Sequence, residues 1–212
     1  MRLNVVLHEQ SVICPRNFFG KSARSVAGQT KPVMNWTGHR AVATTRTMLE
    51  PPNDQHFMRE ALRQAQKARE AGEVPVGAII VLAGKIIGRA HNQVELLKDA
   101  TAHAEMLALT QAEAAIGDWR LTECDLYVTK EPCAMCAGAL VHTRIRRVIF
   151  GCADPVAGAA GSVMNLLQMP GLNHRCGIAS GVLQDECARI LQDFFRKRRN
   201  EEMGNRKSQN LS

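Results

Sequence analysis

The sequence predicts an α/β domain in which helices cover both faces of one β-sheet. The chain has 212 residues, of which 45% are hydrophobic and 22% charged, enough apolar material for one sizeable core. Between residues 54 and 199, stretches of helical periodicity alternate with short β-branched stretches, and no internal repeat is found. No uncharged apolar run approaches the roughly 18 residues of a membrane span, so we expect no membrane segment.

The first elements predict a helix followed by a hairpin. Asp54 is a favourable N-cap and Gly72 a favourable helix stop. Residues 76–82 predict a buried strand, Ala83 and Gly84 a turn, and residues 85–90 the returning strand. One face of the helix carries the small or apolar residues Met58, Ala61, Leu62, Ala65 and Ala68.

The alternation continues through the rest of the domain. The patterns predict a helix over 101–115, a strand over 125–129, a helix over 133–141 and a strand over 147–151. A last amphipathic helix, over 184–199, carries Leu191, Phe194 and Phe195 on one side and ends in a run of cations.

The net charge of +7 is concentrated at the two ends of the chain. Residues 1–52 carry +5, residues 53–195 carry −2 and residues 196–212 carry +4. We therefore expect a nearly neutral folded domain, 53–199, and a basic C-terminal end that faces a polyanion or is simply solvated; residues 200–212 are expected to form a polar tail.

Residues 1–52 have the composition of a basic extension. They show no sustained periodicity and mix Ser, Thr, Gly and Arg. Three interpretations stay open: a disordered or mis-started extension, with Met34 or Met48 as the true start; an organelle transit peptide; or an arm that contacts RNA.

The cysteine count indicates the cellular compartment. Seven cysteines, an odd number, are spread from Cys14 to Cys187 in a chain large enough to fold without disulfides. This favours reduced thiols inside a cell and argues against a secreted disulfide scaffold. We expect a cytoplasmic protein, or an organellar one if residues 1–52 are a transit peptide.

Three residues have the chemistry and spacing of a metal site. Cys133 and Cys136 lie in the first turn of a predicted helix opened by Pro132, so they share a face and the helix N-terminus favours their thiolates. His103, in a second predicted helix start, would complete a set of three ligands. Three protein ligands leave one position for water, the arrangement of a hydrolytic zinc site. We expect one zinc ion per subunit.

Glu105 is the acid nearest to this set. A carboxylate beside an activated water can accept its proton and return it to a leaving amine. Taken alone, the Cys-x-x-Cys pair could be a redox pair or half a zinc ribbon, and His-x-Glu is commonplace; their combination favours the metal site. The remaining cysteines and histidines lack paired spacing and are expected in the core or on the surface: Cys124, Cys152, Cys176, Cys187, His91, His142 and His174.

The region from about Phe57 to Arg199 resembles the bacterial tRNA-specific adenosine deaminases, within the zinc-dependent cytidine/deoxycytidylate deaminase superfamily. His-x-Glu followed by Pro-Cys-x-x-Cys is the signature of zinc-dependent nucleobase deaminases. The resemblance covers about two-thirds of the chain and is carried by the segments 73–78, 101–105, 131–138, 144–151, 158–162, 173–175 and 193–196, with Asn92 and Asp154.

The resemblance implies a cytidine deaminase-like fold, a three-layer α/β/α sandwich with a mixed sheet of about five strands. It implies a homodimer that converts the wobble adenosine of a tRNA, typically an arginine acceptor, to inosine. It also implies that His103, Cys133 and Cys136 hold zinc and that Glu105 shuttles protons. Asn92 would hold the flipped base, Asp154 would touch the RNA backbone, and Phe195, Arg196, Arg198 and Arg199 would grip the anticodon stem-loop.

Two positions depart from the family pattern, and two other functions stay open. Lys130 replaces a usual Leu and Ala100 a usual Pro, which affects packing near the pocket or substrate affinity. The alternatives are a deaminase of cytidine, guanine or another small nucleoside or base, and a catalytically silent RNA-binding subunit. The basic C-terminal run argues against a small-substrate deaminase, because each cation placed near a phosphate raises the affinity for a polyanion, which a small substrate does not need. Glu105 argues against a silent subunit, because such a protein could discard a residue that binds no metal.

Overall fold

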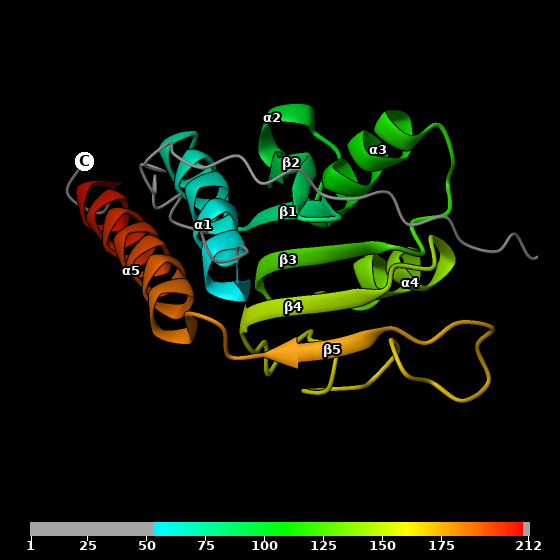
Figure 1. Ribbon diagram of the computed structural model, residues 1–212. Helices are drawn as coiled ribbons and strands as arrows, with labels where there is room; N and C mark the ends of the chain where they lie inside the picture. The colour runs from blue at the N-terminus through cyan, green and yellow to red at the C-terminus, as the bar shows by residue number, and fades with distance from the viewer. Residues whose placement is uncertain (1–52, 210–212) are drawn as a thin grey trace, which may run out of the picture. The chain divides into compact units, whose positions relative to one another are not determined.

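The computed structural model describes residues 53–209, which contain one five-stranded sheet with helices on both faces (Figure 1). The predictions made for residues 1–52 and 210–212 lie outside the described residues. The strands are β1 (Gly77–Leu82), β2 (Lys85–His91), β3 (Cys124–Lys130), β4 (Arg147–Cys152) and β5 (Gly177–Ser180). The helices are α1 (Asp54–Glu70), α2 (Val94–Leu97), α3 (Ala104–Ile116), α4 (Ala134–His142) and α5 (Gln184–Gln209).

The sheet is mixed, with the strand order β2-β1-β3-β4-β5. Strand β1 runs antiparallel to β2 and β3, whereas β3, β4 and β5 are parallel to one another. Parallel neighbours end at the same edge of a sheet, so Lys130 of β3 and Cys152 of β4 are register partners there. The loops that leave this edge carry Cys133 and Asp154.

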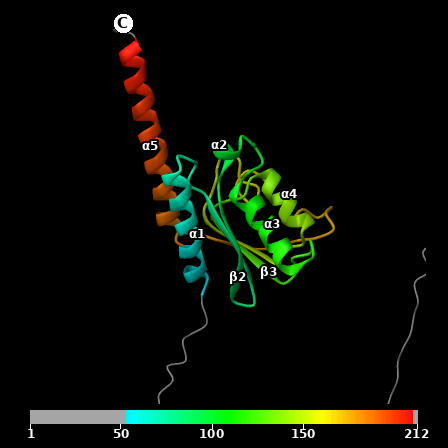
Figure 2. The ribbon, with the colours of Figure 1, turned by 90° about the horizontal axis from the view of Figure 1, so that it is seen from above.

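Alternate residues of the central strands enter two different cores. Ile80 and Leu126 pack with α3 and α4, whereas Ile79, Tyr127 and Ile149 pack with α1 and α5. This alternation is the period-2 geometry of a strand buried on both faces. Figure 2 shows α1 and α5 on one side of the sheet and α3 and α4 on the other. The predicted three-layer sandwich is therefore confirmed.

A glycine allows α1 to approach the sheet. A Cβ atom at Gly77 would lie 2.1 Å from the carbonyl oxygen of Ala61 and 2.4 Å from the amide nitrogen of Ala65. Any larger residue would displace the helix from β1.

The structure differs from the predictions at several element boundaries. Strand β5 and the single-turn helix α2 were not predicted, since β5 has only four residues and α2 has no side-chain cap. Asn53, not Asp54, is the N-cap of α1 and accepts a hydrogen bond from the amide of His56. Helix α5 continues ten residues past the predicted end at Arg199.

Within residues 53–209, no helix combines the length and apolar character of a membrane span.

Candidate metal and substrate site

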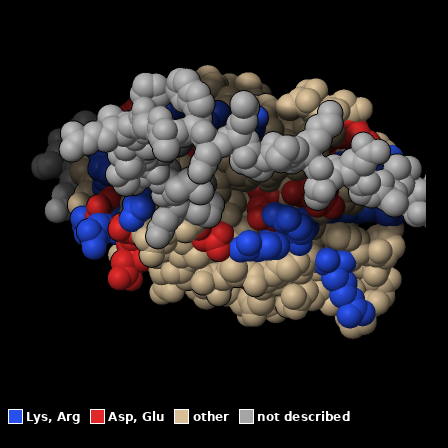
Figure 3. Space-filling view, in the orientation of Figure 1, with Lys and Arg blue, Asp and Glu red and all other residues tan. Residues whose placement is uncertain are grey.

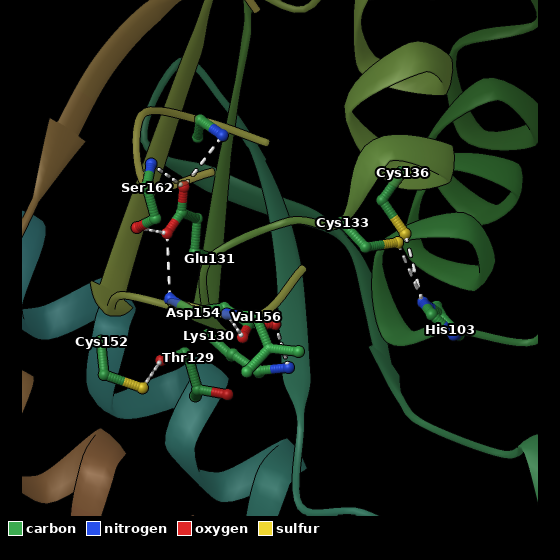
Figure 4. Close-up of polar contacts among 11 residues, drawn as sticks. His103, Thr129, Lys130, Glu131, Cys133, Cys136, Cys152, Asp154, Val156 and Ser162 are labelled. Atoms are coloured by element: carbon green, nitrogen blue, oxygen red, sulfur yellow. Dashed lines mark hydrogen bonds and ion pairs between the residues drawn. The ribbon is translucent and has the colours of Figure 1, made fainter. Parts of the chain in front are cut away.

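The starts of two helices bring three potential metal ligands together. His103 is the N-cap of α3, Cys133 is the N-cap of α4, and Cys136 lies in the first turn of α4. The Nδ1 atom of His103 lies 3.7 Å from the Sγ of Cys133 and 3.4 Å from that of Cys136. Figure 4 shows both sulfur atoms pointing toward the imidazole.

The electrostatics of this cluster favour a thiolate. Hydrogen bonds from Cys136 and His103 lower the pKa of Cys133 to about 3. The interaction with Cys133, followed by burial, raises the pKa of Cys136. The hydrogen bond to Cys133 also raises the pKa of His103. A divalent cation between the three groups would favour deprotonation of both thiols.

The donor set fits a metal ion of the zinc type. One ligand atom from each of the three residues lies within 4.8 Å of the others, and in the described part of the chain this is the one such cluster of His, Cys, Asp and Glu. Two sulfur donors and one imidazole nitrogen are typical zinc ligands. The predicted ligands are thus brought together, and the cluster could bind a metal.

Glu105 lies beside this cluster in a cavity of about 350 Å³. Its side chain is 4% exposed, and burial raises the pKa of its carboxyl group above the ordinary value. His103, Cys133 and Asn92 line the same cavity. The cavity thus combines two potential metal ligands with a buried acid next to them and the amide of Asn92.

Glu73 lines the cavity and positions the side chain of Asn92, a role that the sequence did not indicate. It is 1% exposed, and its carboxylate accepts hydrogen bonds from the side-chain amide of Asn92 (3.1 Å) and the backbone amides of Glu95 (3.2 Å) and Leu96 (2.7 Å). The carboxylate therefore fixes the side chain of Asn92 at the cavity. Because these partners lie 19 to 23 residues away, no local motif reveals the contact.

Glu131, which also lines the cavity, holds the loop that follows β4 by accepting hydrogen bonds from it. It is 2% exposed and accepts hydrogen bonds from the backbone amides of Asp154 (2.9 Å), Ala160 (2.9 Å) and Ser162 (3.0 Å), and from the hydroxyl of Ser162. A Cβ atom at Gly158 would lie 2.4 Å from this carboxylate, so the loop can close around it only with glycine there. Figure 4 shows this arrangement next to Asp154.

Asp154 and Lys130 form an ion pair at the edge of the cavity. The Nζ of Lys130 lies 2.5 Å from the Oδ2 of Asp154. Lys130 lines the cavity, whereas Asp154 is not among its lining residues. Ala100 is exposed in the turn before α3 and does not line the cavity. Of the two departures from the family pattern, only Lys130 thus borders the cavity.

Helix α5 brings two of its four predicted substrate-binding residues to the cavity. Phe195, 41% exposed, and Arg198 line it, while Phe194 is buried. Arg196 pairs instead with Asp193 (2.6 Å) and lines a groove between α1 and α5. In Figure 3, Lys and Arg side chains at the α5 edge lie among Asp and Glu. Arg199 is exposed and borders neither space.

Comparison with known proteins places the chain among deaminases. Residues 52–199 match the family model of MafB19-like deaminases. The chain is 49% identical to the tRNA-specific adenosine deaminase of Bacillus subtilis, over 73% of this chain and 96% of that protein. It is 51% identical to the tRNA-specific adenosine deaminase of Aquifex aeolicus, over 69% and 96%, respectively.

Solved structures agree with this assignment. A structure from a study of A-to-I editing by tRNA:A34 deaminases superposes with a TM-score of 0.62 at 45% identity, over 64% of this chain and 99% of that one. A guanine deaminase from Nitrosomonas europaea shares the fold, with a TM-score of 0.58 at 23% identity, over 66% and 83%. The sequence identities, together with the fold, show that the chain belongs to the family of the bacterial tRNA-specific adenosine deaminases.

Proposed function

We propose that the protein is a zinc-dependent hydrolase that converts the wobble adenosine of a tRNA to inosine. The observation that carries the proposal is that His103, Cys133, Glu105 and Asn92 line one cavity. The chain that forms this cavity shares about half of its aligned residues with tRNA-specific adenosine deaminases. The hydrolytic reaction replaces the amino group at C6 of adenine with oxygen and releases ammonia.

The three clustered residues would hold one zinc ion per subunit through the Nδ1 of His103 and the Sγ atoms of Cys133 and Cys136. Bound there, zinc would supply a water molecule of lowered pKa and a Lewis acid close to the substrate. The N-termini of α3 and α4 both point into the cluster, and their dipoles stabilise the thiolates.

Glu105 is the proposed proton shuttle. Its burial raises its pKa, which brings the carboxyl group closer to the range where it can both accept and donate a proton near neutral pH. In this role, it takes a proton from the attacking water and protonates N1 of adenine. It then passes the second proton to the departing amino group.

Asn92 is the proposed contact to the base. Its amide nitrogen is already engaged by Glu73, so its Oδ1 is the remaining acceptor for a donor on the substrate. A cavity of about 350 Å³ receives a base only after that base leaves its stack, which costs least in a loop. An anticodon loop meets this requirement.

The RNA contacts are proposed for the rim of the cavity. Phe195 presents an exposed aromatic ring on which a neighbouring base can stack, and Arg198 adds a positive charge beside it. Arg196 and Arg199 lie on the same helix outside the cavity and would contact phosphates of the anticodon stem. Asp154 does not line the cavity itself; it is paired with Lys130, which does, so we expect its contact with the RNA backbone to be made next to Lys130.

Three finer features belong to the same proposal: an arginine acceptor as the tRNA, a cytoplasmic location and a homodimer. The homodimer is supported by large apolar side chains that are exposed within one region. Val156 is 84% exposed, Val163 51% and Met164 46%, and exposed apolar side chains that gather in one segment are typical of protein–protein contacts. Light scattering of the purified protein would show twice the mass of one chain.

The proposed reaction is tested by incubating the zinc-loaded protein with bulk tRNA and sequencing the product. Inosine is read as guanosine, so the expected result is adenosine read as guanosine at wobble positions only. Conversion of free cytidine or guanine without any change in tRNA would instead support the small-substrate alternative. Absence of conversion on tRNA, nucleosides and bases, with zinc bound, would support a silent RNA-binding subunit.

A further inference from the structure

Lys130 is a cation in a cavity whose charged walls are mainly acidic. Among the described residues that line the cavity, Lys130 and Arg198 are its cations, and the acids are Glu73, Glu95, Glu105 and Glu131. Arg198 belongs to α5, at the rim. Lys130 ends β3, three residues before Cys133, and lies within electrostatic reach of His103.

The Lys130 side chain is anchored from behind. Its ammonium group pairs with Asp154, whose side chain is 7% exposed and whose other oxygen accepts a hydrogen bond from the amide of Val156 at 3.1 Å. Burial alone would raise the pKa of Asp154, but the hydrogen bonds from Lys130 and the backbone keep it below its ordinary value. The carboxylate is thus ionised at neutral pH and holds the ammonium on the cavity side.

The ammonium group retains the capacity to bind an anion. An ammonium group has three donors, and within residues 53–209 Asp154 is its one ion-pair partner. The Lys130 side chain is 34% exposed, so this capacity is accessible from the cavity. An adenosine that enters to react at C6 is itself neutral. When it is part of an RNA chain, it brings a phosphate on its 3′ and its 5′ side.

We propose that Lys130 is a specificity-determining residue that pairs with a phosphate of the target nucleotide, so that the cavity favours a nucleotide over a free nucleoside. This inference rests on the proposed function. Lysine suits the task because its compact charge pairs with a phosphate oxygen. Since the phosphate is not the reacting group, the contact acts on substrate binding.

The test compares Lys130→Gln and Lys130→Arg with the unsubstituted protein on an anticodon stem-loop. Gln can still donate a hydrogen bond to Asp154, which protects the fold, whereas Arg keeps the charge. The matched control is Lys85→Gln, which removes an exposed cation at the opposite end of β1 and β2. Metal content and thermal melting are measured for every variant.

Lys130→Gln is expected to raise KM for the stem-loop roughly three- to tenfold. It should also reduce the slope of log affinity against log salt concentration by about 0.7 in magnitude, the contribution of one phosphate contact on a single strand. Lys130→Arg should restore most of the affinity and the slope, and Lys85→Gln should leave both unchanged. An unaltered slope and KM in Lys130→Gln would overturn the proposal.

A competition experiment tests the same contact without relying on a variant. Adenosine, adenosine 3′-monophosphate and adenosine 5′-monophosphate are compared as inhibitors of stem-loop deamination. At least one monophosphate should inhibit the unsubstituted protein more strongly than adenosine, and Lys130→Gln should abolish the difference. If neither monophosphate is preferred while the stem-loop is converted, the Lys130 inference fails and the proposed function stands. If the stem-loop is not converted, the proposed function itself fails.

Discussion

Replacing Glu131 by Gln should destabilise the protein more than any comparable change on its surface. The four hydrogen bonds to this carboxylate come from three backbone amides and one hydroxyl, and the side chain is 2% exposed. The amide nitrogen of Gln would replace one accepting oxygen and leave at least one buried backbone N–H without a partner, at a cost of about 1–3 kcal/mol. The surviving bonds would also lose their charge assistance. We expect a loss of about 2–4 kcal/mol in the free energy of unfolding.

Urea unfolding in zinc-containing buffer measures this loss, with an unchanged m-value as the sign that the unfolded state is the same. Glu70→Gln, an exposed change near the end of α1, is the control and should alter the free energy of unfolding by less than about 0.5 kcal/mol. A Glu131→Gln variant as stable as this control would refute the reasoning.

The contribution of Glu131 to the free energy of unfolding should also depend on pH. Burial alone would raise the pKa of its carboxyl group, but the hydrogen bonds from Ser162, Asp154 and Ala160 hold it below the ordinary value of 4.5. A lowered pKa means that the stabilisation is complete above the unfolded value and is lost as the pH falls toward the folded one. The difference in stability between the parent and Glu131→Gln should therefore narrow on acidification from pH 7 to pH 4.

Three further predictions concern the cavity. Metal analysis should find one zinc ion per chain, and Cys133→Ala should lose most of it; two tightly bound ions, or full retention in the variant, would contradict the ligand assignment. Glu105→Gln should keep zinc and fold but lower the rate roughly 10²- to 10⁴-fold, so near-normal turnover would remove Glu105 from the mechanism. Arg198→Gln should weaken stem-loop binding and flatten its salt dependence, while Arg120→Gln, which changes a cation that does not line the cavity, should not.

The sequence predicted best what is encoded locally. Pro132, Cys133 and Cys136 define the start of a helix within one turn, so their common direction follows from helix geometry alone. His103 is 30 residues away from Cys133, so no local spacing links the two; ligand chemistry, a predicted helix start at each residue and the family motif did. The central strands were predictable because short runs of apolar and β-branched residues are typical of strands buried on both faces.

The sequence could not reveal the residues that act through distant backbone groups. Glu73 and Glu131 bind amides 19 to 31 residues away, and such contacts leave no spacing pattern. The basic run on α5 did not indicate which cations reach the cavity. That choice depends on helix phase and on local pairing, which turns Arg196 toward Asp193 and leaves Arg198 beside Phe195. Strand β5 is too short and too exposed to give a periodic signal.

The central claim is that this cavity deaminates an adenosine presented by an RNA loop. The most direct test measures inosine formation, under identical conditions, from an anticodon stem-loop with adenosine at the wobble position and from the same strand in a perfect duplex. A base held in a duplex cannot reach Glu105 and the cluster of potential metal ligands without being flipped out, at a cost of a few kcal/mol. Rapid conversion of the stem-loop with little or no conversion of the duplex is the predicted result. Equal rates on both, or no inosine in the stem-loop, would contradict the account.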